Sequence, residues 1–285
     1  MPPVDIRRVV DRIQNLPTLP TVVMQIMKLV NNPSSNAQDV QVILHRDQSL
    51  TTTVMKLVNS SFYGYAGKIT TLQQAVVILG FETIKSVALS ATVFSAFSKT
   101  GRAEFDRSAF WQHSIATAVA ARLLAHEAKL KLAEEAFVAG IIHDIGKVVM
   151  DEYAPELFDQ VIAHAREHDT LLYEAERAVL GFSHAQLGRW LGTKWGLPYP
   201  LIDAIFYHHQ PANAQKAPQL TALVHIGDIL ARTCKLGSGG DAKVPPLDPA
   251  AWSLVGISEQ ALRKILDRLP AEFQKADIYV QMARA

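Results

Sequence analysis

Apolar residues recur at helical spacing along most of the chain. Positions three and four residues apart are apolar in residues 19–30, 37–44, 50–58 and 84–94. This periodicity is typical of amphipathic helices, whereas sustained alternation of apolar and polar residues, the pattern of a half-buried strand, is absent. The sequence therefore predicts an all-α protein whose helices of about three turns are joined by short loops.

Several residues mark the expected ends of these helices. Asn36 precedes residues 37–44 and Ser108 precedes a long apolar pattern, so both occupy positions where a side chain can cap a helix N-terminus. Gly80 follows residue 79 as a C-terminal cap. Near the end of the chain the pattern predicts two further helices, at residues 258–269 and 270–282.

The helical pattern lapses in two places. Residues 98–106 read SKTGRAEFD, and we place here the boundary between an N-terminal lobe, residues 1–100, and a second lobe, residues 108–285. Residues 237–249 contain GSGG and three prolines and predict an exposed loop. The GSGGDAK run lacks the spacing of a phosphate-binding P-loop. No repeat of fixed period is visible, which argues against a solenoid.

Composition excludes several classes of protein. The chain has 285 residues, 49% hydrophobic and 19% charged, which is typical of compact soluble domains. A formal net charge of +1 gives no excess field for phosphate backbones, so we expect no nucleic-acid partner. Cys234 is the only cysteine, and the first fifteen residues carry charges where a secretory signal needs an apolar run, which predicts a cytoplasmic protein. Residues 87–97 fall short of the ~20 residues of a membrane span, so we expect a buried helix there and no membrane contact.

The most informative run is His143-Asp144-Ile145-Gly146-Lys147, directly after the apolar residues 137–142. Burying a His–Asp pair costs free energy unless it finds a partner, and a divalent cation accepts both imidazole nitrogen and carboxylate oxygen. Lys147 lies one helical turn beyond His143, so we expect it to face a phosphate held beside the metal. The His–Asp dipeptide alone also fits an ordinary hydrogen-bonded pair.

The second lobe holds further residues of the same chemistry. His113 and His184 lie inside apolar helical patterns, His208 and His209 form a tandem pair, and Asp228 interrupts an apolar stretch. So many potential ligands are hard to explain as isolated core residues, and together they predict a metal site. The candidate ligands are His113, His143, Asp144, His184, His208, His209 and Asp228.

Other chemically capable residues receive the simpler interpretation. His45, His126, His164 and His168 have charged or polar neighbours, and we assign them no role. His225 could support the metal site, but we expect a hydrogen-bonded core histidine. The aromatic pair in residues 59–64, NSSFYG, could dock a ligand or partner, but we expect it to pack against the other lobe.

The order His113, His143-Asp144, Asp228 resembles the H…HD…D pattern of the HD superfamily of helical, metal-dependent phosphohydrolases. The N-terminal lobe resembles the HDOD branch through LPTLP at residues 16–20, RDQSLTTTVMKLVNSSFYG at 46–64, and residues 69–80, which end in ILG. The resemblance covers nearly the whole chain. It implies a bacterial signalling module in which N-terminal HDOD helices precede an HD-type helical bundle.

Similarity to the related HD-GYP phosphodiesterases implies a role for each candidate residue. Asp144 would bridge two metals, and Lys147 would contact a substrate phosphate. The first metal would be held by His113, His143, Asp144 and Asp228, and the second by Asp144, His184, His208 and His209.

The chain departs from the HD-GYP pattern in two places. After the tandem histidines it reads Gln210-Pro211 and lacks the segment that names that group, which argues against hydrolysis of cyclic-di-GMP. Ala109 stands where three-metal members carry a carboxylate, so we expect at most two metals.

Two functions remain open at this point. The first is a signalling protein that uses a metal-loaded lobe as structure or sensor and acts through contacts with unidentified signalling proteins. The second is a metal-dependent phosphohydrolase acting on a nucleotide or cyclic dinucleotide, with Asp144 and Lys147 as catalytic residues and two ions roughly 3.5–4 Å apart. We favour the first. Imidazoles and carboxylates without thiolate suit one or two divalent ions of Fe, Mn, Ni or Zn.

Overall fold

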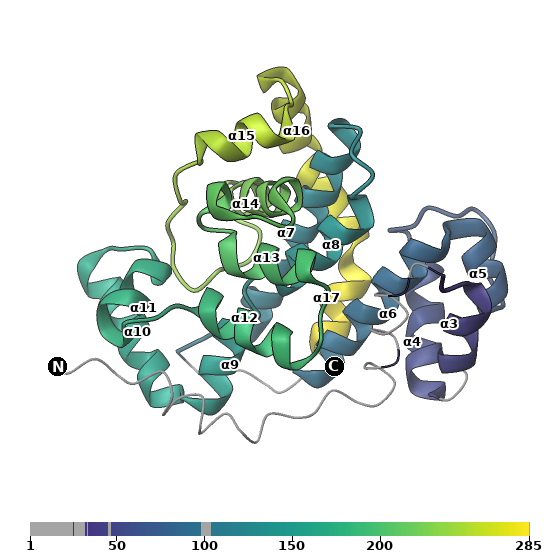
Figure 1. Ribbon diagram of the computed structural model, residues 1–285, viewed down its shortest axis with the longest axis horizontal. Helices are drawn as coiled ribbons and strands as arrows, with labels where there is room; N and C mark the ends of the chain where they lie inside the picture. Colours follow the sequence, from purple (N-terminus) through teal and green to yellow (C-terminus); the bar gives the residue numbers. More distant parts are fainter. Residues whose placement is uncertain (1–24, 26–31, 33, 45–46, 98–103, 285) are drawn as a thin grey trace.

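The computed structural model describes residues 25, 32, 34–44, 47–97 and 104–284. Within these residues the chain is a set of α-helices without a β-strand, as the hydrophobic periodicity predicts (Figure 1). The helix expected at residues 19–30 lies outside the described part, apart from Gln25. None of the described helices combines the length and the apolar character needed to cross a membrane.

Four helices form an N-terminal group, at the right of Figure 1. They are α3 (Ala37–Leu44), α4 (Gln48–Val58), α5 (Leu72–Leu79) and α6 (Phe81–Ala96).

The ends of α3 and α5 follow the sequence signals. Asn36 caps α3, because its Oδ1 accepts a hydrogen bond from the N–H of Gln38 at 2.8 Å. Gly80 ends α5 with a φ of 88°, a conformation that glycine adopts without steric strain. The next helix, α6, is buried along most of its length, as expected for the apolar stretch that is too short to span a membrane.

The long helix α7 (Arg107–Glu127) organises the rest of the molecule. Against it lie α8 (Ala133–Ile142) and α14 (Pro218–Thr233). The approach of α8 is close because Gly140 has no side chain: a Cβ at this position would overlap the backbone of Ala118. Side chains from three helices can therefore meet in the narrow space around α7.

The remaining helices surround this group (Figure 1). They are α9 (Ile145–Tyr153), α10 (Pro155–His168), α11 (Leu172–Leu180), α12 (His184–Lys194), α13 (Tyr199–Tyr207), the 3₁₀ turn η2 (Pro211–Asn213), α15 (Pro249–Val255), α16 (Glu259–Lys275) and α17 (Asp277–Arg284).

Two predicted helix ends are wrong. The N-cap of α7 is Asp106, whose Oδ1 accepts from the N–H of Ala109 at 2.9 Å, and Ser108 lies inside the helix. Pro270 does not start a new helix but lies within α16. The stripe of buried residues in α16 includes Ile265 and Leu269 and leads directly to the proline, so packing outweighs the hydrogen bond that proline cannot donate.

An aromatic cluster joins the N-terminal helices to the rest of the chain. Phe62 packs on Phe137 of α8 at a ring-centroid distance of 5.1 Å, and the hydroxyls of Tyr63 and Tyr279 share a hydrogen bond of 2.7 Å. The guanidinium of Arg122 lies 4.7 Å from the centre of the Phe62 ring. The NSSFYG turn thus packs against the second part of the chain, which is the simpler of its two interpretations.

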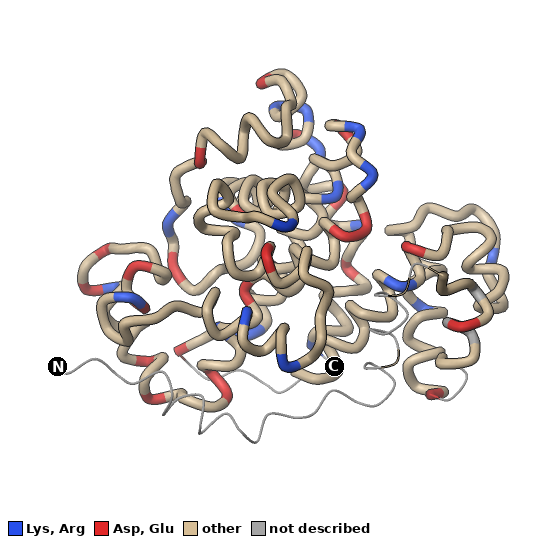
Figure 2. Tube along the Cα trace, in the orientation of Figure 1, with Lys and Arg blue, Asp and Glu red and all other residues tan. Residues whose placement is uncertain are grey.

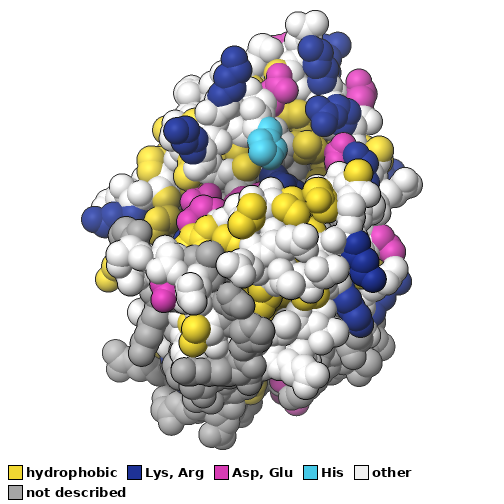
Figure 3. All heavy atoms as spheres, turned by 90° about the vertical axis from the view of Figure 1, so that its right-hand side faces the viewer, with side chains coloured by type: hydrophobic (Ala, Val, Ile, Leu, Met, Phe, Trp, Pro, Cys, Tyr) yellow, Lys and Arg dark blue, Asp and Glu magenta, His cyan; other side chains and the backbone are white. Residues whose placement is uncertain are grey.

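Positive and negative side chains are interspersed over the trace (Figure 2). On the face that includes the N-terminal helices, hydrophobic side chains gather between charged ones (Figure 3). A cavity of ≈ 330 Å³ lies between α6, α8 and the start of α13, and its lining includes Glu82, Lys85, Glu134 and Leu201. None of its lining residues is a candidate metal ligand.

Candidate metal centre

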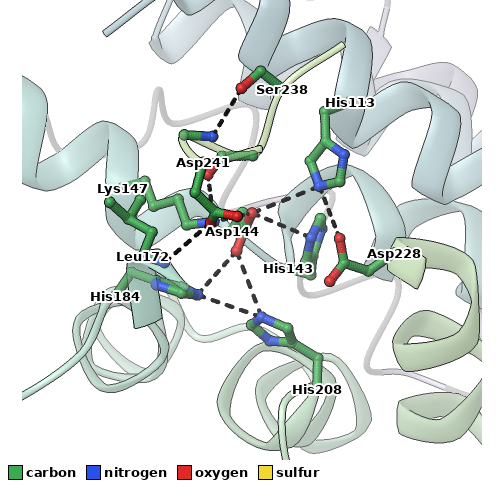
Figure 4. Close-up of polar contacts among 12 residues, drawn as sticks. His113, His143, Asp144, Lys147, Leu172, His184, His208, Asp228, Ser238 and Asp241 are labelled. Carbon is green, nitrogen blue, oxygen red and sulfur yellow. Dashed lines mark hydrogen bonds and ion pairs between the residues drawn. The ribbon is translucent and has the colours of Figure 1, made fainter. Parts of the chain in front are cut away.

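All seven candidate ligands come together, six of them buried, and Figure 4 labels these six. They come from α7, the turn between α8 and α9, the start of α12, the end of α13, and α14. Their ligand atoms form two groups, in each of which all atoms lie within 4.8 Å of one another. The first group is His113, His143 and Asp228; the second is Asp144, His184, His208 and His209.

His143 and Asp144 occupy the turn where α8 ends and α9 begins, which directs both side chains inwards (Figure 4). Nδ1 of His143 lies 2.7 Å from the carbonyl oxygen of Gly140. Because a carbonyl oxygen only accepts, Nδ1 carries the proton and Nε2 keeps a lone pair. That Nε2 atom is buried and has no hydrogen-bond partner. This is the orientation that metal-binding histidines adopt.

His184 and His208 are oriented by the same principle. Nδ1 of His208 donates to the carbonyl of Ile205 at 2.8 Å, and Nδ1 of His184 lies 2.7 Å from a carboxylate oxygen of the fully buried Glu176. Their Nε2 atoms both face the centre and are 3.4 Å apart. A divalent cation between them would accept both nitrogens as ligands.

Asp144 belongs to the second group and also lies beside the first. Its Oδ1 is 2.9 Å from Nε2 of His184 and 3.5 Å from Nε2 of His208, whereas its Oδ2 is 3.3 Å from Nε2 of His143. Burial raises the pKa of this carboxyl, but His143, Lys147 and His184 lower it by more, so the pKa lies well below its usual range. Asp144 is therefore an anion with one oxygen facing each group.

The first group pairs His113 with Asp228. Nε2 of His113 lies 3.0 Å from Oδ1 of Asp228, and burial lowers the pKa of this histidine. Burial raises the pKa of Asp228, but Arg232 and His113 lower it well below the ordinary value. Arg232 donates from Nε to Asp228 Oδ1 at 2.8 Å. At neutral pH this pair is a neutral imidazole beside a carboxylate.

His209 is the one candidate ligand that is only partly buried. Its Nε2 lies 3.0 Å from Nε2 of His184, and its ring lies 4.2 Å from that of Tyr173. Burial and the neighbouring His208 lower the pKa of His209 well below its ordinary value, and burial lowers the pKa of His208 to about 4. Both rings are therefore neutral at pH 7.

The donor set fits one or two divalent transition-metal ions. It consists of imidazole nitrogens and carboxylate oxygens without thiolate, a set suited to Fe, Mn, Ni or Zn. Four buried polar atoms of the candidate ligands lack a hydrogen-bond partner, and such atoms are rare in folded proteins unless a water or an ion satisfies them. They are Nδ1 and Nε2 of His113, Nε2 of His143 and Oδ1 of Asp144.

Lys147 is not open to the exterior. Its side chain is 1% exposed, and Nζ donates to Oδ2 of Asp144 at 2.6 Å and to the carbonyl of Gly239 at 2.8 Å. The sequence predicts that residues 237–249 form an exposed loop. This is wrong for Gly239, which is buried where the loop reaches into the metal centre.

Sequence reasoning missed three charged residues of this centre. Glu176 holds His184, and Arg232 joins Asp228 to Asp241 of the loop, with Nη1 of Arg232 donating to Asp241 Oδ1 at 2.9 Å. The sequence does contain a signal for Glu176. This residue lies four positions after one buried leucine of α11 and four before another, which places it on the buried side of the helix. Asp241 carries no such signal, because it lies in a loop.

His225 is a hydrogen-bonded core histidine, as expected. Its Nδ1 donates to the carbonyl of His208 at 2.7 Å, and its Nε2 accepts from the N–H of Asp248 at 3.0 Å. Neither nitrogen is left for a metal. His45 lies outside the described residues.

The HDOD domain family matches residues 16–211 of this chain. The chain belongs to the HDOD family. An HDOD protein of unknown function from Geobacter sulfurreducens has a crystal structure with a TM-score of 0.82, 26% sequence identity, and coverage of 95% of both chains. This HDOD chain also matches an uncharacterised Treponema pallidum protein at 24% identity over 269 residues, which is 93% of the chain and 51% of the relative. It therefore spans about half the length of that curated relative.

Two further solved structures share the fold of this chain. A protein from Shewanella amazonensis, named as a candidate phosphohydrolase, has a TM-score of 0.74 and 22% identity, with 97% of this chain and 98% of the other covered. A Marinobacter aquaeolei protein, named as a candidate signal transduction protein, has a TM-score of 0.78 and 22% identity. That match covers 98% of this chain and 65% of the other. At these identities the likeness establishes the fold.

Proposed function

We propose that this HDOD protein is a bacterial signal-transduction module with a retained mono- or dinuclear metal site that acts through contacts with partner proteins. His113, His143 and Asp228 would hold one divalent ion, and His184, His208 and His209 the other. Asp144 would contribute one oxygen to each. Bound metal would stabilise the folded state and fix α7, α12, α13 and α14 relative to one another.

The observation that carries this proposal is the burial of the centre. Asp144 and Lys147 are each 1% exposed, and the loop containing Gly239 packs over Lys147. Hydrolysis of a nucleotide needs an open position for the substrate, whereas a structural or sensing metal needs a closed set of ligands. The closed centre therefore supports the signalling function over catalysis.

A second candidate function is metal-dependent hydrolysis of a phosphoester. It is supported by the two oxygens of Asp144, which face separate ligand groups as in a dinuclear site. Bound ions would supply an activated water and neutralise charge on the phosphoryl oxygens. Asp144 would be a ligand of both ions. Lys147 would bind a phosphoryl oxygen once its hydrogen bond to the Gly239 carbonyl is broken.

The two functions are separated by a turnover assay. Protein reconstituted with Mn²⁺ or Fe²⁺ is incubated with phosphoesters, nucleotides and cyclic dinucleotides, and Asp144→Ala prepared in parallel reveals contaminating hydrolases. Stoichiometric metal without turnover supports the signalling function. Turnover that is lost in Asp144→Ala overturns it and establishes the phosphohydrolase.

A further inference from the structure

Lys147 is a buried cation with two oxygen partners. One is Oδ2 of Asp144 and the other is the backbone carbonyl of Gly239, at 2.6 and 2.8 Å. The first partner is a candidate metal ligand and the second belongs to the loop. The ammonium therefore lies where the loop meets the metal centre.

Arg232 is a second buried cation that binds both a candidate metal ligand and the loop. Its Nε donates to Asp228 at 2.8 Å, and its Nη1 donates to Asp241 at 2.9 Å and to the carbonyl of Lys243 at 3.0 Å. A Cβ on Gly239 would clash with this guanidinium, so the loop passes directly over it. Both cations thus bind one ligand carboxylate and at least one oxygen of the same loop.

Further hydrogen bonds hold the loop in place. The N–H of Ser238 donates to the carbonyl of Ala109 at 2.9 Å, and the N–H of Gly240 donates to the Ser238 hydroxyl at 3.1 Å. Asp241 accepts from the N–H of Leu172, the first residue of α11, at 3.0 Å (Figure 4). The first contact joins the loop to α7 and the third joins it to α11, the second lies within the loop, and none of them is a hydrogen bond within a helix.

We propose that Lys147 and Arg232 form an oxyanion-binding pair, and that residues 239–241 occupy this pair as an internal ligand that a phosphate group displaces. Ammonium and guanidinium groups are the side chains that recognise phosphate best. The carbonyl of Gly239 and the carboxylate of Asp241 supply the oxygens that a phosphate would otherwise supply. This inference rests on the proposed function for its location, because the pair lies beside the proposed metal ligands.

Displacement of the loop gives the signalling function an input. A phosphate on Lys147 and Arg232 would release Asp241 from Leu172, so the start of α11 would lose its contact with the loop. The same helix carries Glu176, which orients His184. An anion at the pair would therefore change both the surface of the loop and the support of one metal ligand.

The test compares the affinity for inorganic phosphate of the full chain, Asp241→Asn and Asp47→Asn, by isothermal titration calorimetry in chelator and again with Mn²⁺. Asp47 is the matched control, because its carboxylate also accepts from the N-terminal N–H groups of a helix, at Leu50. Asparagine keeps an acceptor but removes the negative charge that competes with phosphate. We expect Asp241→Asn to bind phosphate about tenfold more tightly and Asp47→Asn to match the wild type.

A second measurement covers the case in which Asp241→Asn fails to fold. In wild-type protein, phosphate should increase hydrogen exchange at the amides of Ser238 and Gly240. Unchanged phosphate affinity in a folded Asp241→Asn, or unchanged exchange at these amides with saturating phosphate, overturns the proposal. Absence of metal uptake would remove the proposed function, while the competition measured in chelator would still decide this inference.

Discussion

Glu176 and His184 form a buried pair in which a carboxylate oxygen of Glu176 lies 2.7 Å from Nδ1 of the imidazole. The backbone N–H of His184 also donates a hydrogen bond of 2.8 Å to this carboxylate. Burial lowers the pKa of His184, but Glu176 and Asp144 raise it above the ordinary value. The pair fixes the ring and makes Nε2 more basic, so it supports a metal bond without touching the metal.

Glu176→Gln should weaken metal binding at the second group. The amide keeps the shape but removes the negative charge, and loss of such a supporting carboxylate costs about 10- to 100-fold in metal affinity. Competition against a fluorescent chelator measures the change. Glu174→Gln is the matched control, because Glu174 lies two residues earlier on the same helix and only caps its start. Equal metal affinity in both variants would contradict the role of Glu176.

Asp144→Ala should remove the response of thermal stability to metal. The substitution deletes the anionic ligand that both groups share, so both ions should weaken together, whereas His184→Ala should weaken mainly the second. Thermal melts of the three proteins in chelator and in Mn²⁺ measure this. An Asp144 that served only as a hydrogen-bonded neighbour would instead cost about 1 to 3 kcal/mol irrespective of metal.

Stability in chelator should fall as the pH is lowered from 6.5 towards 4. The pKa values of His113, His208 and His209 are lowered in the folded state, to about 4 for His208, so below pH 6.5 the unfolded chain binds more protons than the folded chain. The lowered pKa values of His126 and His225 act in the same direction, and the raised pKa values of His184, Glu134 and Glu135 act against it, which leaves five groups against three. Urea unfolding across this range tests the sign, and stability that rises towards pH 4 would contradict it.

Gly237→Ala should damage both the fold and the metal centre. Gly237 has a φ of 75°, and a Cβ there would overlap the backbone of His113 and Ala109. Gly256→Ala is the matched control, because Gly256 has a φ of 68° with nothing within 4 Å of its Cβ position. We expect the control to lose about 1–2 kcal/mol from backbone strain alone. Gly237→Ala should lose more and bind less metal, and equal losses would show that the loop is not seated against α7.

The Tyr63–Tyr279 hydrogen bond should couple the N-terminal helices to the C-terminal helix. Either Tyr→Phe change leaves the other buried hydroxyl without its partner, at about 1–3 kcal/mol. The double variant should therefore cost less than the sum of the single variants. Urea unfolding of the four proteins gives the coupling energy, and strict additivity would show that the bond does not contribute.

The helices could be predicted from the sequence because apolar periodicity and packing act together in most of them. Asn36 and Gly80 mark helix ends through local geometry, which the sequence displays directly. Pro270 misled the prediction, because the buried stripe of α16 depends on neighbours that only the fold brings close.

The candidate ligands could be recognised in the sequence because imidazoles and carboxylates in apolar surroundings are unusual one by one. Their division into two groups depended on resemblance, and in the structure their ligand atoms lie in two clusters. The position of the 237–249 loop over Lys147 could not be predicted, because the contact of Gly239 with Lys147 joins residues 92 positions apart and involves a backbone carbonyl. A glycine-rich run carries no sign of which side chain its carbonyls will meet.

The most direct test of the metal centre is elemental analysis of protein purified without added metal, with Asp144→Ala analysed in parallel. The account predicts one to two equivalents of a divalent transition metal in the wild type, taken up again after chelation, and a large loss in the variant. Wild-type protein that contains no transition metal and takes up none on reconstitution would contradict it.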